Sequence, residues 1–476
     1  MKFINKFWPL LFLIVFFGFL FFFRFDWSTL ANWDEAWYGS VARNIAKTGN
    51  FMYMDFNGRP YYDHPPVAFI LMALSIKIFG VNAFAVRFPS ALLGLGSIVM
   101  MYLLGKELFK ERLVGFASAL ILGTSVWYLI RVRSGDLDAT FVFFYLLTVF
   151  MSVKSSRNFY LFPLTMAAFA LLVLSKTFVG LSAGVLIIFT NFSQFFKSKR
   201  NLLVAFAGVA VFVALAFPWY YAQLTRFENF YEEHFIKVGL RSKGFSSFFH
   251  LETNLPLFYL HMGVRKWYYL WLASLGLILL SLRFVKKEYF LVLLWNLVIL
   301  YPFLTTNETH IWHLIPVYLP MALIISSGFY WGKELFRRIA KIKKLDWLLN
   351  LGYAALFVGL SIIQVKNFYK EVYPTSIYTP YDVDVSKHAA GLDKKIYLDD
   401  DFYPIAIYYS GRQMNVLAFQ PEGKRKAMDI FKSEEKDFSM ITRNYVLNLL
   451  SEAGIDYKVD YRNKSYSIIS KPTSQP

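Results

Sequence analysis

The sequence contains no cysteine, and this absence excludes several classes of site. Without a thiol the chain has no disulfide, no cysteine nucleophile and no zinc–thiolate centre. It also lacks a phosphate-binding Walker loop, a dinucleotide-binding glycine fingerprint and a serine–histidine nucleophile signature. We therefore expect no nucleotide cofactor.

Charged residues are scarce, and apolar residues are abundant. Only 17% of the 476 residues are charged, whereas 57% are hydrophobic and 20% are aromatic. A soluble globular chain has about 25% charged and roughly 45–50% apolar residues. The apolar excess is gathered in blocks, which is typical of a polytopic membrane protein.

Acidic residues are outnumbered by basic ones, so the formal net charge is +18. A nucleic acid partner would explain this charge, but the basic residues lie in short connectors between apolar blocks. Connectors of this kind stay on the cytoplasmic side of a membrane protein. The pattern favours a topological signal, and we expect no nucleic acid to bind. The clusters are Lys106, Lys110 and Arg112; Lys154 and Arg157; Lys197, Lys199 and Arg200; Arg283, Lys286 and Lys287; and residues 333–344.

Eleven segments are apolar enough to cross a bilayer, since a spanning helix needs about 20 such residues. If Lys2 and Lys6 hold the N-terminus in the cytoplasm, alternate crossings put every basic cluster inside and the C-terminus outside. We therefore predict a multi-pass protein of the cell (plasma or inner) membrane. The segments are 8–25, 88–106, 113–131, 138–154, 159–175, 178–196, 202–221, 267–284, 289–305, 313–332 and 347–365.

Two apolar segments allow an alternative interpretation. Residues 67–79 follow Pro65-Pro66, contain Lys77 and end before Gly80. This run is short for a span, so we expect a helix that lies at the membrane interface. Segment 8–25 could be a cleaved signal peptide, but the Phe-rich residues that follow its core favour a retained anchor.

The chain changes character near residue 366. The stretches "DKKIYLDDD" and "QMNVLAF" indicate short strands, "RNYVLNLLSEAGI" an amphipathic helix, and "YKVDYRNKSYSIIS" a hairpin that turns at Asn463-Lys464. We predict two parts. Residues 1–365 form an all-α membrane domain whose first outer loop, 26–87, holds interfacial helices, and residues 366–476 form a small soluble α/β domain outside the membrane.

With this topology, ionisable residues from five separate loops gather on the outer side. Ionisable groups at bilayer edges that face one aqueous cavity are a site hypothesis by default. Their convergence is stronger evidence than any single motif. The residues are Asp34 and Glu35; Asp63 and His64; Arg131, Arg133, Asp136 and Asp138; Glu232, Glu233, His234, Lys237 and Arg241; and Glu308, His310 and His313.

Each of these groups also has a purely structural explanation. Asp34 can be the N-cap of a helix that stops at Gly49, with Glu35 favourable to the helix dipole. Asp136 and Asp138 can solvate a turn. A metal-binding pair is one interpretation of Glu233-His234, and a solvated loop helix is the other. His310 and His313 have metal-like spacing, but an aromatic interfacial belt explains them equally well.

The order of motifs resembles a known family. "DEAWYGSVARNIAKTGNF", "NGRPYYDHPPVAFILMALSIKIFGVNAFAVRFPSAL", "RSGDLDATFVFFYLLTVF", "LLVLSKTFVGL", "FPWYYA" and "EEHFIKVG" follow one another across roughly residues 30–330. This series is similar to the dolichyl-phosphate-mannose-protein mannosyltransferase superfamily of GT-C glycosyltransferases. Within it, the chain looks like the bacterial branch that includes lipid A 4-amino-4-deoxy-L-arabinose transferases.

The resemblance implies that a polyprenyl-phosphate sugar is used on the outer face with inversion at the anomeric carbon. It implies that Asp34 is the catalytic base and that Glu35 is its partner. Asp138 matches the aspartate that the family has after the third span. The acceptor would be a lipid, a glycan or a protein. His64 stands where the branch typically has a lysine that contacts the donor phosphate, and Trp37 where an arginine is common. Asp63 and His234 match positions that resemble ligands of a divalent metal ion.

The chemistry of such a transfer fits these residue types. The leaving phosphate needs cationic stabilisation, which His64, Arg133, Lys237 and Arg241 can supply. The incoming hydroxyl needs a positioned carboxylate, which Asp34 can provide. Two other functions predict different features. A lipid or glycan transporter or flippase would carry ionisable residues in mid-span and inverted repeats, and a scaffold would not need Asp34, Glu35 or Asp138.

Overall fold

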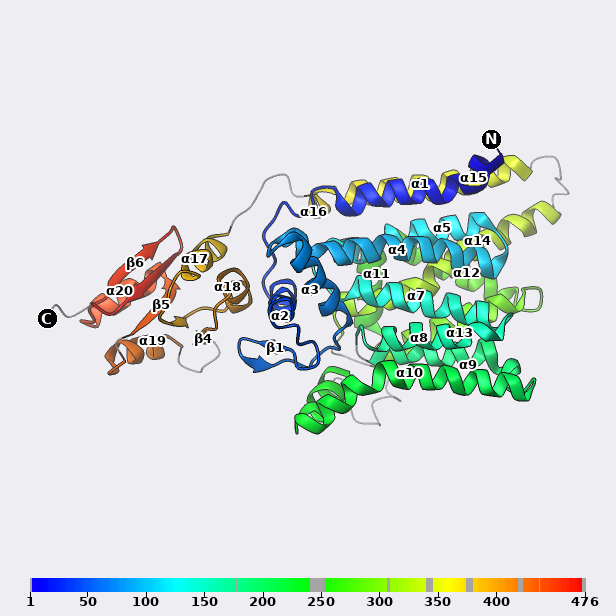
Figure 1. Ribbon diagram of the computed structural model, residues 1–476. Helices are drawn as coiled ribbons and strands as arrows, with labels where there is room; N and C mark the ends of the chain where they lie inside the picture. The colour runs from blue at the N-terminus through cyan, green and yellow to red at the C-terminus, as the bar shows by residue number, and fades with distance from the viewer. Residues whose placement is uncertain are drawn as a thin grey trace. The chain divides into compact units, whose positions relative to one another are not determined.

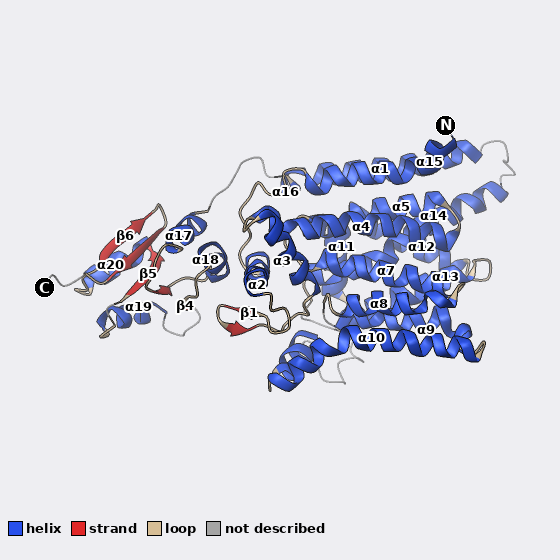
Figure 2. Ribbon diagram, in the orientation of Figure 1, coloured by secondary structure: helices blue, strands red, loops and turns tan. Residues whose placement is uncertain are grey.

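The computed structural model describes residues 2–176, 178–239, 251, 253–305, 309–339, 346–373, 380–417, 423–435 and 437–472 (Figure 1). Arg241 and Glu308, two of the predicted site residues, lie outside these ranges. The described chain is mostly helical, with a two-stranded and a five-stranded sheet (Figure 2).

The α-helices are α1 (Lys2–Phe22), α2 (Asp34–Thr48), α3 (Val67–Phe79), α4 (Ala83–Phe109), α5 (Arg112–Gly123), α6 (Val126–Val132), α7 (Asp138–Ser155), α8 (Phe162–Val173), α9 (Ser182–Phe195), α10 (Lys199–Arg226), α11 (Asn254–Val264), α12 (Lys266–Leu280), α13 (Lys287–Leu304), α14 (Tyr318–Ile339), α15 (Asp346–Asn367), α16 (Tyr369–Val372), α17 (Tyr381–Ala389), α18 (Tyr403–Ser410), α19 (Gly423–Lys432) and α20 (Asn444–Glu452). The other helical segments are η1 (Phe159–Leu161), η2 (Phe178–Leu181), the π-helix η3 (Tyr231–Gly239) and η5 (Ile311–Val317). The strands are β1 (Asp55–Phe56), β2 (Arg59–Pro60), β3 (Lys395–Leu398), β4 (Asn415–Val416), β5 (Phe438–Arg443), β6 (Lys458–Arg462) and β7 (Tyr466–Ser470).

The contacts divide the chain into two compact units. Unit 1 comprises Met1–Phe25, Tyr62–Ala68 and Arg87–Tyr373, and unit 2 comprises Asp26–Tyr61, Phe69–Val86 and Pro374–Pro476. Unit 2 thus includes most of the loop 26–87, which is predicted to lie outside, as well as the C-terminal sheet. The division into 1–365 and 366–476 stays a prediction.

Unit 1 contains the long apolar helices. Six of the described helical stretches are long and apolar enough to cross a membrane, or seven if the bent pair α5–α6 is one span. This confirms a multi-pass membrane protein. All eleven predicted segments fall on helices, but several of these helices are shorter than a full span, so the count of eleven and the orientation stay predictions.

Helix packing in unit 1 depends on small residues. The helix α8 packs against both α7 and α10, and α14 packs against α5 and α12 (Figure 1). Where α4 passes α5, a Cβ on Gly105 would lie 2.9 Å from the Gly115 Cα, and one on Gly115 would lie 2.3 Å from the Tyr102 carbonyl oxygen. Glycine therefore permits the close approach of these two backbones.

The predicted span 113–131 is broken in the structure. α5 and α6 meet at a bend of 73°. At the break, the Thr124 hydroxyl donates to the Leu120 carbonyl (2.7 Å) and the Ser125 hydroxyl to the Ile121 carbonyl (2.8 Å). The Gln364 side chain of α15 donates to the Thr124 carbonyl at 2.9 Å. A backbone acceptor released by the bend is thus satisfied, as a low-dielectric environment requires.

The short apolar run after Pro65-Pro66 forms a helix with the predicted bounds. α3 spans Val67–Phe79, and Gly80 ends it with φ = 81° while its N–H donates to the Ile76 carbonyl at 2.9 Å. A left-handed φ favours glycine, which explains the stop. The position of α3 at the membrane interface remains a prediction.

The sheet of unit 2 has the strand order β4-β3-β5-β7-β6. β3 is parallel to β4 and β5, whereas β7 is antiparallel to β5 and β6. The predicted hairpin is therefore present as β6–β7. Along β3, Ile396 and Leu398 are buried on one face and Tyr397 on the other, so helices must cover both faces.

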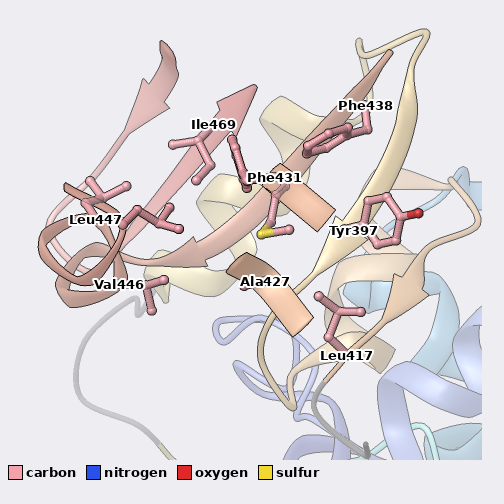
Figure 3. Packing of buried hydrophobic residues seen from close by; sticks show 10 residues of the cluster. Tyr397, Leu417, Ala427, Phe431, Phe438, Val446, Leu447 and Ile469 are labelled. Atoms are coloured by element: carbon pink, nitrogen blue, oxygen red, sulfur yellow. The ribbon is translucent and has the colours of Figure 1, made fainter. Parts of the chain in front are cut away.

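One face of this sheet is covered by α19 and α20. Figure 3 shows Phe431 and Ala427 of α19 and Val446 and Leu447 of α20 around the sheet residues. The cluster is completed by Tyr397, Leu417, Phe438, Met440, Leu450 and Ile469. Such buried side chains give unit 2 a hydrophobic core of its own.

Candidate functional site

The first predicted carboxylate pair lies at the start of α2 in unit 2. Asp34 is half-buried, and Glu35 is buried. The Glu35 carboxylate accepts a hydrogen bond from the Ala31 N–H at 2.7 Å. Glu35 therefore holds the turn that leads into the helix, and this turn sets the position of Asp34.

The structure differs from the N-cap explanation of Asp34. Trp33, rather than Asp34, is the N-cap residue, with φ = 66° and ψ = −121°. Its side chain makes no capping hydrogen bond. Asp34 is the first helical residue, so capping by its side chain, the structural explanation of this aspartate, is not what starts α2. At the other end Gly49 stops the helix in the left-handed conformation, as predicted.

In unit 1, Asp138 lies between two cations. Lys176 donates to Oδ1 of Asp138, and Arg131 Nε lies 3.4 Å from Oδ2. Arg131 also pairs with Asp136 through Nη1 at 2.6 Å. Both aspartates are buried, and a buried carboxylate needs such partners. The turn between α6 and α7 thus holds a fixed arrangement of charges.

Lys176 is a site residue that the sequence did not single out. It lies in the break between α8 and η2, and its side chain is 18% exposed. In the sequence it is one lysine at the end of an apolar run, within "LLVLSKTFVGL". The signal that could have identified it is the absence of other basic residues nearby, since each of the basic clusters between the apolar segments contains several.

The segment before α3 lies near the same place. The Val67 N–H donates to the Leu174 carbonyl at 3.1 Å, which fixes Pro65-Pro66 to the end of α8, two residues before Lys176. His64 is close enough to Asp138 for an electrostatic interaction. This proximity is compatible with the predicted convergence, and a shared site for His64 and Asp138 stays a prediction.

Arg131 also connects this group to the loop before α14. Its guanidinium lies over the Trp312 ring, with 4.9 Å between Cζ and the ring centroid. The His310 N–H donates to Nδ1 of His313 at 3.0 Å. This hydrogen bond stabilises the loop, and Trp312 of the same loop contacts Arg131 of the charged group.

His234, a predicted metal ligand, is held by backbone and aromatic groups. Its Nδ1 lies 3.0 Å from the Tyr62 carbonyl oxygen and 3.1 Å from that of Asp63, so Nδ1 carries the proton and donates. Burial lowers the pKa of His234 to about 4, against the effect of these two hydrogen bonds. The ring is thus neutral at pH 7, and its Nε2 is an acceptor. The surrounding rings are Trp219, Tyr220, Phe230 and Phe235.

Asp63 is the other predicted metal ligand. Burial, followed by the charge of Glu233, raises its pKa to about 6. Among the described residues there is no group of three or more His, Cys, Asp or Glu side chains that could hold a metal ion. Asp63 and His234 alone do not make a metal centre, so no chemical step is assigned to a metal here.

Two of the predicted phosphate-binding residues, Arg133 and Lys237, contact other groups. Arg133 donates to the Leu20 carbonyl (2.8 Å) and the Phe21 carbonyl (3.1 Å) and lies over the Tyr373 ring, so it caps the C-terminal end of α1. Lys237 is exposed and pairs with Glu233 at 2.6 Å. Arg241 lies outside the described residues. Substrate-binding roles for these three residues stay predictions.

The arrangement in unit 1 is suited to an anion. Lys176 and Arg131 present cationic N–H donors beside the buried carboxylate of Asp138, and donors of this kind can also hold a phosphate group. The protein arranges these donors before any ligand arrives, which is the condition for electrostatic stabilisation of developing charge.

Comparison with known proteins points to one family. A family model described as dolichyl-phosphate-mannose-protein mannosyltransferase matches residues 63–221, a range that contains His64, Asp138 and Lys176. An uncharacterized protein of Aquifex aeolicus (strain VF5) is 30% identical over 47% of this chain and 45% of its own length. An undecaprenyl phosphate-alpha-4-amino-4-deoxy-L-arabinose arabinosyl transferase of Pseudomonas paraeruginosa is 25% identical over 75% of this chain and 66% of its own length. The matched part is thus less than two thirds of either relative.

A solved structure has the same fold. ArnT from Cupriavidus metallidurans, in a crystal structure bound to undecaprenyl phosphate, has a TM-score of 0.70 over 98% of both chains at 16% identity. The predicted resemblance to GT-C glycosyltransferases, and to the arabinosyl transferases among them, is confirmed.

Proposed function

We propose that this chain is an integral-membrane glycosyltransferase that moves a sugar from a polyprenyl-phosphate carrier to an acceptor on the extracytoplasmic face. One relative named above is an arabinosyl transferase, and one fold relative was solved with undecaprenyl phosphate. A lipid-linked donor also explains why a membrane protein without a nucleotide-binding motif would transfer sugars.

The observation that carries this proposal is the charged group around Asp138. Lys176 and Arg131 flank this buried carboxylate, and His64 lies within electrostatic reach of it. Lys176, Arg131 and His64 all lie in one unit, and the Pro65-Pro66 segment that follows His64 is fixed to the end of α8. We assign them to the phosphate of the donor, where negative charge grows as the sugar leaves. Arg133, Lys237 and Arg241 stay secondary candidates for the same role.

Asp34 is our candidate for the general base. An oxygen of the acceptor hydroxyl forms a new bond to the anomeric carbon, and its proton passes to the Asp34 carboxylate. The bond between the anomeric carbon and the phosphate oxygen breaks, and its electron pair leaves with the polyprenyl phosphate. A single displacement of this kind inverts the anomeric configuration. Glu35 positions Asp34, and Asp138 positions the cations.

The strained residue beside Asp34 supports this assignment. Trp33 has φ = 66°, a conformation that a bulky residue rarely adopts. Such strain costs on the order of 1–3 kcal/mol and clusters at functional sites.

We further propose the orientation and the parts of the chain. The N-terminus is cytoplasmic, residues 1–365 form the transferase domain with its outer loop 26–87, and residues 366–476 form an extracytoplasmic domain. Asp63 and His234 are our candidates for a divalent metal ion, and the mechanism above does not use one.

The test is a transfer assay with purified protein in lipid nanodiscs. Undecaprenyl phosphate mannose and undecaprenyl phosphate 4-amino-4-deoxy-L-arabinose serve as donors, and an extract of envelope lipids and glycans serves as acceptor. We expect release of undecaprenyl phosphate that requires the extract, and a loss of about a hundredfold or more in Asp34→Asn, because general-base catalysis contributes roughly 10²–10⁴-fold. Wild-type rates in Asp34→Asn would remove Asp34 from the mechanism.

A further inference from the structure

Four aromatic rings of unit 2 meet beside Asp34. Trp33 and Trp37 come from the start of α2, Phe56 from β1 and Tyr403 from the first position of α18. The Trp37 and Phe56 rings are stacked, with centroids 4.2 Å apart and planes 15° apart, and the planes of Trp33 and Trp37 differ by 22°. Tyr403 meets Trp33, Trp37 and Phe56 edge to face, with centroids 5.4–5.9 Å away.

Packing explains only part of this cluster. Phe56 and Tyr403 are 7% and 9% exposed, so these rings join the outer loop to the C-terminal sheet as core residues do. Trp33 is 44% exposed and has a left-handed backbone. A large apolar side chain that is both exposed and held in an unfavourable conformation contributes little to a core. A ligand that covers the indole accounts for both properties.

The exposed indole lies next to the candidate base. Trp33 directly precedes Asp34, and Trp37 is on the same face of α2 as Asp34, because residues three apart along a helix are neighbours. The exposed indole and the Asp34 carboxylate therefore belong to adjacent residues at the start of α2.

We infer that Trp33, supported by Trp37 and Tyr403, is a carbohydrate platform that holds a sugar ring of the acceptor. The inference rests on the proposed function and deepens it: of the lipid, glycan and protein acceptors, it selects one that carries a pyranose at the attacking hydroxyl. The apolar C–H face of a pyranose packs flat on an indole, whose face is negative and attracts the positively polarised C–H groups. Meanwhile the hydroxyls at the rim of the ring remain available, and one of them can give its proton to Asp34.

The platform can be tested with free glycosides. Methyl glycosides of glucose, mannose, galactose and N-acetylglucosamine are added to the full chain in nanodiscs that contain no sugar-based detergent, and saturation-transfer NMR detects binding. We expect a signal from the C–H protons of one ring face for at least one glycoside. No signal from any of the four would overturn the inference.

Two substitutions distinguish a role of the Trp33 ring in binding from a role in the stability of the fold. Trp33→Gly removes the indole and relieves the left-handed strain, so the midpoint of thermal unfolding should be unchanged or higher while the glycoside signal is lost. Trp33→Phe keeps an aromatic ring and should keep most of the signal. Trp347→Ala, at a tryptophan of α15 that is 66% exposed, is the matched control and should bind as the wild type does. A full signal in Trp33→Gly would overturn the platform.

Adding the donor to the protein tests whether the glycoside occupies the acceptor site or the donor site. With either undecaprenyl phosphate sugar named above present, the glycoside signal should persist, and its displacement would overturn the assignment to the acceptor. In the transfer assay, Trp33→Gly should raise the KM for the acceptor about tenfold and leave the KM for the donor within twofold, as expected for the loss of one aromatic contact.

Different experimental results would refute the carbohydrate platform and the proposed transferase function. Asp34→Asn should abolish transfer and retain the glycoside signal. If Trp33→Gly transfers sugar at the wild-type rate, the platform is refuted but the transferase function is not. If glycosides bind in a manner that depends on Trp33 but the wild-type chain transfers no sugar, the transferase function is refuted but the platform is not.

Discussion

Lys176 and Asp138 are the pair on which the chemistry of unit 1 depends. Lys176 donates a hydrogen bond to the Asp138 carboxylate, whose Oδ2 also lies 3.4 Å from Nε of Arg131. An aspartate this buried is stable only while its charge is compensated. The same two cations are the groups that we assign to the donor phosphate, so their structural and catalytic roles are joined.

A double substitution separates these two roles. Lys176→Met should lower the free energy of unfolding by about 3 kcal/mol, because it leaves a buried carboxylate with one partner fewer. Asp138→Asn with Lys176→Met should recover most of that loss and still be at least about a hundredfold slower in transfer, because the phosphate has lost a cation. Thermal unfolding and the transfer assay in nanodiscs measure both. A double variant with wild-type activity would make the pair purely structural.

At this scale the sequence predicted some site residues and missed others for identifiable reasons. His64 and Asp138 were predicted to face one site, and His64 is close enough to interact electrostatically with Asp138. Lys176 was missed because its partner lies 38 residues earlier in the chain. Arg133 was predicted to bind substrate, which stays a prediction, and its contacts with carbonyls of α1 more than a hundred residues away were not predicted. The partner of a charged residue cannot be predicted from the neighbouring sequence when that partner lies far away along the chain.

Among the elements, the crossing of α4 and α5 depends on glycine. A methyl group on Gly115 would lie 2.3 Å from a backbone oxygen of α4, so the helices would have to separate. Gly115→Ala should therefore lower the free energy of unfolding by about 1–3 kcal/mol, the usual range for overpacking. Gly276→Ala is the matched control, since a Cβ there meets nothing within 4 Å. Equal unfolding midpoints for the two variants would contradict the close approach.

The sheet of unit 2 has an ion pair at the ends of β3 and β5. Arg443 donates to Asp400 through Nε and, at 3.2 Å, through Nη2. Burial raises the pKa of Asp400, but the hydrogen bonds from Arg443 more than offset this, and the pKa is below its usual range. A depressed pKa stabilises the folded state above the unfolded value near 4, and this stabilisation is lost as the pH falls through the folded pKa.

A cysteine reporter tests this ion pair, because the chain has no thiol of its own. Ser439→Cys places a thiol at a buried position of β5. At pH 7, Arg443→Gln should speed its labelling by dithiodipyridine about fivefold, equivalent to about 1 kcal/mol for a pair whose arginine is half exposed. As the pH falls through the depressed pKa of Asp400 and the carboxyl becomes protonated, the difference should vanish. A difference that persists there would mean that Arg443 acts through packing.

Secondary structure was predictable where the signal is local. Gly49 and Gly80 stop their helices as predicted, and β6–β7 forms the predicted hairpin. The break between α5 and α6 was not predicted. Thr124 and Ser125 are common in unbroken apolar helices, and the bend is supported by Gln364, 240 residues away. The start of α2 was misplaced by one residue because it depends on the backbone angle of Trp33.

For the whole molecule, the orientation in the membrane is the next prediction. Lys464→Cys lies in the β6–β7 turn and Lys286→Cys in the connector before α13. If the C-terminus is outside and the basic connectors are inside, an impermeant maleimide should label the first in intact cells and the second only after the membrane is opened. The reverse result would invert the topology, and labelling of both would refute the count of crossings.

The most direct test of the central claim, that this chain takes a sugar from a polyprenyl phosphate, is the profile of lipid-linked sugars in cells. Cells that lack the native protein are supplied with the wild-type chain or with Asp34→Ala, and their lipid extracts and surface glycans are compared by mass spectrometry. We predict that one glycosylated polyprenyl phosphate accumulates in the Asp34→Ala cells, while their surface glycans lose the same sugar. Identical profiles with the wild-type chain, with Asp34→Ala and with neither would contradict the claim.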